Sequence, residues 1–122
     1  MLRTPTDHAS RTEIIGRLND RCRLGVDRTA RAVITRNCLA TFSNGERMSE
    51  IVAQARILAA VRAHRFPQDD RSERDRGQVE YEGQTIYFAI DAYDLDLRYG
   101  SDDPADASLT RRVMTIMVRE DL

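Results

Sequence analysis

The chain contains no lysine and no tryptophan, and it has only two cysteines and two histidines. These scarcities limit the chemistry that its side chains can offer. Cys22 and Cys38 are too far apart for a CxxC metal or redox motif, so we predict reduced thiols buried as small hydrophobic groups. His8 and His64 have no partner at metal-ligand or catalytic spacing. We therefore predict no nucleophile–base pair of a serine or cysteine with either histidine.

Long apolar runs are absent as well. No stretch approaches the roughly 20 apolar residues that a membrane-spanning helix needs, so we expect no membrane partner. The N-terminal sequence MLRTPTDHAS has no apolar signal region, which predicts a cytoplasmic protein. There is no glycine-rich phosphate loop, and we expect no cofactor. The length of 122 residues predicts one domain spanning 1–122.

Charge is unevenly distributed along the chain. All nineteen basic residues are arginine, a side chain that forms paired hydrogen bonds with carboxylates and phosphates. Residues 1–66 carry twelve arginines and six acidic residues, a net charge of +6, whereas residues 67–122 carry seven and fourteen, a net charge of −7. In a compact domain the two halves either interdigitate and cancel, or form a basic and an acidic surface.

Two segments have the pattern of amphipathic helices. Residues 11–24 follow a capping box, in which Ser10 and Glu13 satisfy first-turn amides, and Gly25 is suited to the C-terminal cap. Residues 49–65 carry a second apolar stripe that ends before Pro67. Outside these helices, residues 1–9 are predicted to be a frayed tail and the polar residues 68–77 a mobile surface loop.

Four segments have strand character. Residues 31–42 are strand-compatible, with a bulge or break near Arg36 and Asn37. A hairpin turning at Glu82-Gly83 follows, and an apolar strand covers 113–118. The order α-β-α-β-β-β predicts an α+β fold, a two-layer sandwich of two helices on a mainly antiparallel sheet of about four strands.

The region between the last two strands combines aromatic, acidic and basic residues. Alternation in the hairpin directs Ile86, Phe88 and Ile90 to the core and Tyr87 and Asp91 to the opposite face. Asp103-Pro104 is predicted to begin a short helical turn over about 104–110, with Asp103 as the N-cap. The neighbouring acids are expected to cap turns and to pair with Arg98, Arg111 and Arg112.

The same region carries a long recognisable motif. It comprises Tyr93-Asp94, Asp96-Leu97-Arg98, Gly100-Ser101, Asp103-Pro104-Ala105-Asp106, Thr110, Arg112-Val113 and Thr115-Ile116-Met117. With these residues, and with Leu18-Asn19-Asp20-Arg21, Arg56-Ile57-Leu58, Val61-Arg62 and the Gly83 hairpin, the chain resembles over residues 14–120 a bacterial family known as domain of unknown function 3768. It departs from that pattern at Glu73 to Gly77, where the family has a histidine and an aromatic residue. The resemblance implies a small single-domain protein, often borne on plasmids or other mobile elements beside anti-restriction genes, and it implies no activity or catalytic residue.

We therefore predict a non-enzymatic interaction module that binds a protein partner, with interference in a host defence or nucleic-acid-handling protein as one form of that role. The candidate partner-binding residues are Tyr87, Asp91, Tyr93, Asp94, Asp96, Arg98, Tyr99 and Asp103. One alternative is a metal-dependent hydrolase or nuclease whose ligands come from the carboxylates of Asp91, Asp94, Asp96, Asp102, Asp103 and Asp106. Another is a DNA-binding protein that uses Arg11, Arg17, Arg21 and Arg28 in and just after the first helix.

Overall fold

The computed structural model describes residues 6–122, with side chains from residue 10 onward. Its elements, in chain order, are α1 (Thr6–Arg23), β1 (Arg31–Ile34), α2 (Arg36–Thr41), α3 (Arg47–Ala63), β2 (Arg76–Tyr81), β3 (Gln84–Tyr93), η1 (Ala107–Leu109), β4 (Arg111–Met117) and η2 (Arg119–Asp121). The fold is therefore α+β, with three helices, two of them long, on a four-stranded mixed and mostly antiparallel sheet. No helix among the described residues is long and apolar enough to cross a membrane.

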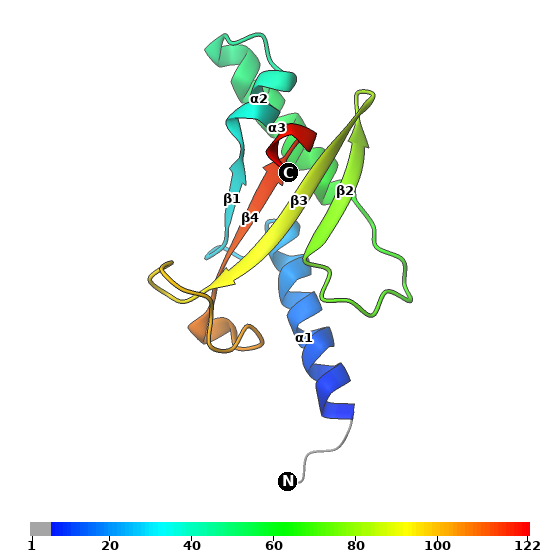
Figure 1. Cartoon of the computed structure of the whole chain (residues 1–122), viewed down its shortest axis with the longest axis vertical. Helices are drawn as coiled ribbons and strands as arrows, with labels where there is room; N and C mark the ends of the chain where they lie inside the picture. The colour runs from blue at the N-terminus through cyan, green and yellow to red at the C-terminus, as the bar shows by residue number, and fades with distance from the viewer. Residues whose placement is uncertain (1–5) are drawn as a thin grey trace.

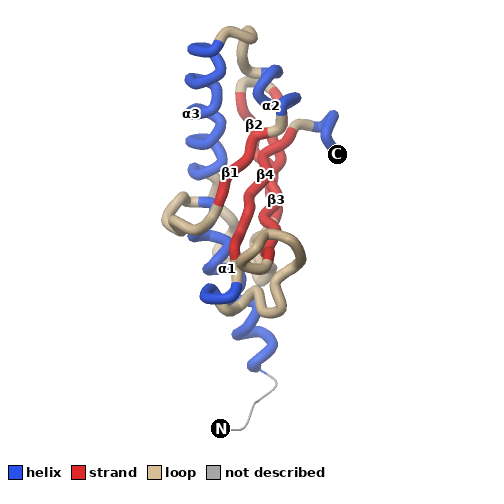
Figure 2. Tube along the Cα trace, turned by 90° about the vertical axis from the view of Figure 1, so that its left-hand side faces the viewer, coloured by secondary structure: helices blue, strands red, loops and turns tan. Residues whose placement is uncertain are grey.

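The sheet has the strand order β1-β4-β3-β2 and places the last strand of the chain in its interior. The pairs β2–β3 and β3–β4 are antiparallel, whereas β1 lies parallel to β4, with Arg31 opposite Val113. Helices α1 and α3 lie behind the sheet in Figure 1 and on one side of it in Figure 2. The sheet therefore has one face covered by the long helices and one face that they leave open.

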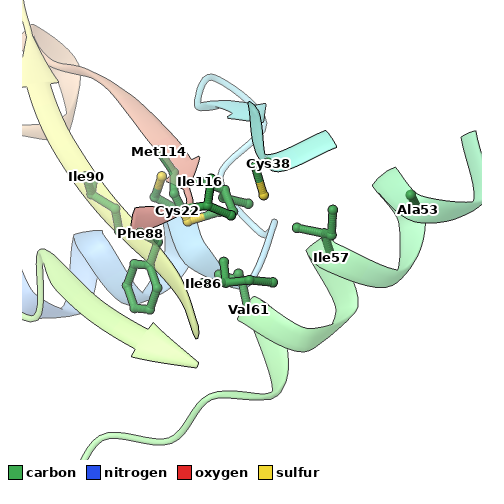
Figure 3. Packing of buried hydrophobic residues seen from close by; sticks show 11 residues of the cluster. Cys22, Cys38, Ala53, Ile57, Val61, Ile86, Phe88, Ile90, Met114 and Ile116 are labelled. Atoms are coloured by element: carbon green, nitrogen blue, oxygen red, sulfur yellow. The ribbon is translucent and has the colours of Figure 1, made fainter. Parts of the chain in front are cut away.

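The helix-covered face holds the core. Alternate residues of β3 and β4 point toward the helices, and the cluster that they form is seen in Figure 3. Its buried members are Cys22, Cys38, Ala53, Ile57, Val61, Ile86, Phe88, Ile90, Met114, Ile116 and Val118. The predicted inward direction of Ile86, Phe88 and Ile90 is thereby confirmed. Both cysteines are free and buried as predicted, and burial raises the pKa of each thiol to about 11.

The first helix begins earlier than its sequence signal indicates. Because α1 starts at Thr6, Ser10 lies inside the helix, and the predicted start at residue 11 is wrong. Residues 1–5 of the predicted tail lie outside the described residues. The side chain of His8 also lies outside the described part of the structure. The predicted role of Gly25 at the end of this helix is confirmed, since Gly25 has a φ of +77° just after the helix. Its amide donates to the carbonyl of Cys22 at 3.1 Å.

The predicted strand 31–42 is wrong beyond Ile34, where a short helix follows. The hydroxyl of Thr35 accepts a hydrogen bond from the amide of Cys38 at 3.1 Å and caps α2. The carboxylate of Asp121 in η2 accepts from the hydroxyl of Thr35 at 2.6 Å and from the side-chain amide of Asn37 at 2.9 Å. The break predicted near Arg36 is real, and it turns the chain into a helix that buries Cys38.

The hairpin between β2 and β3 has the predicted two-residue turn. Both Glu82 and Gly83 have positive φ angles, of +48° and +79°, which is the signature of the primed turn that matches the twist of antiparallel strands. The turn sets the register in which Val79 lies opposite Ile86. This register gives each strand one core-facing row and one row on the open face of the sheet.

Candidate partner-binding surface

The open face of the sheet is built from the residues between the core-facing ones. Strand pairing places Tyr87 beside Met117, Ala89 beside Thr115, and Asp91 beside Val113. In the same rows, Gln78 of β2 lies opposite Tyr87, and Val33 of β1 lies opposite Thr115. We call this surface the outer face; it comprises Arg31, Val33, Arg76, Gln78, Glu80, Thr85, Tyr87, Ala89, Asp91, Tyr93, Arg111, Val113, Thr115 and Met117.

The outer face carries apolar residues on β1, β3 and β4 with charged residues beside them, and its centre is formed by β3 and β4. Val33 is 46% exposed, and Tyr87, Val113 and Met117 are half-buried, so their side chains remain accessible on the sheet surface. Exposed Arg31, Arg76, Glu80 and Asp91 lie around them. No helix among residues 6–122 covers this centre in either view, and η2 lies toward its upper end in Figure 1.

The connection between β3 and β4 adjoins one end of the outer face. The amide of Asp94 donates to the carbonyl of Tyr99 at 2.8 Å, and the carboxylate of Asp94 accepts from the amide of Arg98 at 3.0 Å. Leu97 has a φ of +61° in this turn. As a result the 94–99 turn is tightly closed, and Tyr99 projects from it with 74% of its surface exposed.

The structure changes the predicted role of Asp103 in this connection. Asp103 is not a helix N-cap, because η1 begins only at Ala107 and its N-cap is Asp106, which accepts from the amide of Ser108 at 2.9 Å. The carboxylate of Asp103 instead accepts from the amide of Ala105 and pairs with Arg11 of α1 at 2.6 Å. The hydrogen bond from Arg11 holds the pKa of Asp103 below its usual value.

The eight predicted partner-binding residues therefore divide into two groups. Tyr87, Asp91 and Tyr93 lie on the outer face, whereas Asp94, Asp96, Arg98, Tyr99 and Asp103 lie on the adjoining connection. The two groups meet where Tyr93 forms a bridge with Gly100. Because this bridge joins the end of β3 to the connection, a single partner that covers the end of the sheet can touch both groups.

Three of the six carboxylates proposed as metal ligands serve local structure. Among the described residues, no group of three or more histidine, cysteine, aspartate or glutamate side chains is placed to hold a metal ion. Asp94 closes a turn, Asp103 pairs with Arg11, and Asp106 caps η1. The predicted pairing of these acids with Arg112 is wrong, because the guanidinium of Arg112 donates to Asn19 and to the carbonyl of Pro104.

The arginines of the first helix are partly engaged with acidic residues. Arg11 pairs with Asp103, and Arg17 donates to Glu13 at 3.2 Å. Arg21 and Arg28 are exposed. The pair of Arg11 and Asp103 joins the basic and the acidic half of the sequence, so the two halves do not form wholly separate surfaces.

Three buried arginines form a network that the sequence pattern did not reveal. Arg112, 2% exposed, donates to Asn19 Oδ1 at 2.7 Å and to the carbonyl of Pro104 at 2.6 Å. Arg74, 9% exposed, donates to both carboxylate oxygens of Asp20. Gly16 makes this possible, since a Cβ there would lie 2.6 Å from the Arg74 guanidinium. Arg23 is the third member, and burial lowers its pKa and that of Arg112.

Arg74 and Asn19 also join the segment after α3 to the first helix. The side-chain amide of Asn19 donates to the carbonyl of Glu73 at 3.0 Å. Predicted as loop up to residue 77, this segment ends at Asp75, because β2 begins at Arg76. The mobility of its remaining part stays a prediction. The buried ion pairs of Arg74 could not be predicted from the polar run that contains it, because its carboxylate partners lie more than fifty positions away in the sequence.

The fold and the outer face define a small α+β domain with an open, partly apolar sheet surface. The family model of a protein of unknown function, DUF3768, matches residues 35–121, which is most of the chain. The chain therefore belongs to this family. The match begins after α1, so the resemblance seen at Leu18 to Arg21 lies outside it. No curated protein and no solved structure matches the chain.

Proposed function

We propose that this protein is a non-enzymatic interaction module whose outer face and β3–β4 connection bind a protein partner in the cytoplasm. The observation that carries the proposal is the uncovered sheet surface, where Val33, Tyr87 and Met117 present apolar area beside charged side chains. Interfaces between proteins likewise combine apolar contact area with polar and charged side chains.

The side chains of this surface are of the kinds that dominate binding energy. Tyrosine and arginine are enriched among residues whose truncation weakens protein complexes most. Tyr87 and Tyr93 lie on β3, and Tyr99 projects from the adjoining turn. Arg98 precedes Tyr99 in the chain, and Arg111 of β4 lies opposite Tyr93. The rigid sheet holds the two strand tyrosines in place, which lowers the entropic cost of binding.

The resemblance to a family borne on mobile elements supports a more specific partner. A protein carried on a plasmid benefits from binding a host defence or nucleic-acid-handling protein, and mixed positive and negative side chains on the outer face suit a charged partner surface. The metal-dependent and DNA-binding alternatives have no comparable supporting arrangement among the described side chains.

Affinity capture with matched variants tests the proposal. Tagged wild-type protein and the Tyr87→Ala/Tyr93→Ala variant would be exposed to extract of a bacterial host, beside a Met48→Ala/Val52→Ala control. Met48 and Val52 are exposed apolar residues of α3, away from the outer face. We expect one partner to be retained by the wild type and the control and lost by the tyrosine variant.

Titration calorimetry with the purified partner makes the test quantitative. Each tyrosine truncation is expected to weaken binding by about tenfold or more, which corresponds to roughly 1.4 kcal/mol. Equal affinity of the wild type and the tyrosine variant, or capture of no partner at all, would contradict binding through the outer face.

A further inference from the structure

A cleft lies between α1 and the segment 64–75, which connects α3 to β2. Its volume is about 950 Å³. Sites for small molecules in proteins commonly have volumes of roughly 300–1,000 Å³, so the cleft is large enough for a small organic ligand. None of the residues that line it belongs to the outer face, so it is a separate candidate site.

The lining is rich in arginine. It includes Arg23, Arg65, Arg71 and Arg74, against three carboxylates. Two of these carboxylates, Glu13 and Asp20, are occupied by Arg74, at 3.4 and 3.0 Å respectively. The third, Asp70, accepts hydrogen bonds from the amide and the hydroxyl of Ser72. Among the described side chains, Arg65 and Arg71 form no ion pair with these carboxylates.

The two arginines at the rim are available for a ligand. Arg65 and Arg71 are both exposed. Among the described residues, Arg65 makes only two long hydrogen bonds, of 3.5 Å, to the carbonyls of Arg62 and His64. Within residues 10–122, Arg71 forms no ion pair. Arginine is well suited to oxyanions, because its planar guanidinium donates two parallel hydrogen bonds to a carboxylate or phosphate.

Arg23 adds positive charge to the wall of the cleft. Its side chain is 5% exposed, and Nη1 donates to the carbonyl of His64 at 2.9 Å. Its nearest carboxylate contact, with Asp20, is 3.7 Å long, and Nε is buried without a hydrogen-bond partner among the described residues. Because Nε is closed off from solvent, we assign it no ligand contact. A buried guanidinium with incomplete compensation nevertheless raises the electrostatic potential felt by an anion in the cleft.

The cleft also has an apolar side. Phe66 is half-buried, with its ring 5.4 Å from the guanidinium carbon of Arg23, and Pro67 follows it in the lining. Leu24, at the end of α1, is 41% exposed. Because an inorganic ion would leave this apolar surface in water, a ligand with an apolar group uses the site better.

We propose that the cleft binds a small organic anion, with a phosphate or carboxylate held by Arg65 and Arg71 and an aromatic or other flat apolar group against Phe66, Pro67 and Leu24. The phosphate and the carboxylate share the same chemistry toward arginine, and the experiment distinguishes them. This inference does not depend on protein binding at the outer face.

Titration calorimetry with simple probes tests the inference. Phenyl phosphate and benzoate carry both parts of the expected ligand, whereas inorganic phosphate and benzyl alcohol each carry one. We expect saturable binding of phenyl phosphate or benzoate at one site, at least about tenfold tighter than binding of either single-part probe. The tighter of the two identifies the preferred oxyanion. Absence of saturable binding of both at concentrations up to about 10 mM would overturn the proposal.

Variants assign the binding to the cleft. Arg65→Gln/Arg71→Gln is expected to weaken binding of the preferred probe by about tenfold or more. Its control is Arg47→Gln/Arg119→Gln, which changes net charge equally at two exposed arginines outside the cleft. Unchanged affinity in the rim variant, or an equal loss in the control, would contradict the assignment. Tyr87→Ala should leave probe binding unchanged, so failure of this site and failure of the outer face are distinguishable.

Discussion

The inner and outer faces of the sheet are formed by the same two central strands. On β4, Met114 and Ile116 are almost completely buried, whereas Val113, Thr115 and Met117, which alternate with them, are only half-buried. Each strand therefore supplies one row to the core and one row to the open surface. The comparison teaches that stability and recognition are carried by neighbouring residues of the same strands, so substitutions one position apart can separate them.

The largest difference is expected between Phe88 and Tyr87. Phe88 is 1% exposed and packs edge-to-face near Phe66 and His64, so Phe88→Ala should lower the free energy of unfolding by about 3–5 kcal/mol. Tyr87→Ala, on the outer face, should lower it by about 1 kcal/mol or less, because only cross-strand contacts are lost. Urea denaturation of both variants measures this. Similar losses in the two would mean that the outer face is also part of the core.

The next difference is expected between Arg112 and Arg111. Arg112→Met leaves the acceptor atoms of Asn19 and Pro104 without their donor, which should cost about 2–4 kcal/mol. Arg111→Met removes the same charge from the outer face, where the side chain is half-buried, and should cost less than about 1 kcal/mol. Thermal unfolding compares the two. A neutral Arg112→Met would show that the buried network adds nothing to stability.

The smallest effect concerns η2, which lies toward one end of the outer face. The hydrogen bond from Thr35 is the main cause that lowers the pKa of Asp121 below 3.8, so the ionised carboxylate stabilises the fold. This contribution is complete above about pH 3.8 and is lost as the pH falls through the lower folded value. Asp121→Asn should therefore lower the thermal midpoint at pH 7, and the difference from wild type should shrink below pH 3.8.

Thr35→Ser is the matched control for this pH dependence, because it keeps the hydroxyl that donates to Asp121. Its stability should follow the wild-type pH profile. If the difference between Asp121→Asn and wild type is the same at every pH, the carboxylate is not the source of the stabilisation.

Most of the fold followed from local patterns. Alternation on both sides of Glu82-Gly83 gave the hairpin and its faces, and Gly25 marked the end of α1. The prediction for the segment after Ile34 is wrong because six residues are too few to show a helical period, and the capping hydroxyl of Thr35 is the one local feature typical of a helix start. The parallel pairing of β1 with β4 could not be predicted, because nothing local to either strand specifies it.

The candidate surface was predictable only in part. The positions of Tyr87, Asp91 and Tyr93 on the non-core side of β3 followed from the period of a strand. The partner of Asp103 did not follow, because Arg11 lies in α1, far away in the sequence. Two aspartates, Asp103 and Asp106, also precede similar turns, and the sequence alone does not tell which one caps η1. Long-range pairs of charged side chains are set by the tertiary structure.

The interior position of β4 also governs the order in which this protein can assemble. Among the described strands β1 pairs only with β4, and Arg111 at the start of β4 comes eighty positions after Arg31. During synthesis the hairpin of β2 and β3 can form. The other edge of β3 stays unpaired until β4 is available. Completion of the sheet thus waits until β4 has been synthesised, and the nascent protein carries exposed apolar side chains until then.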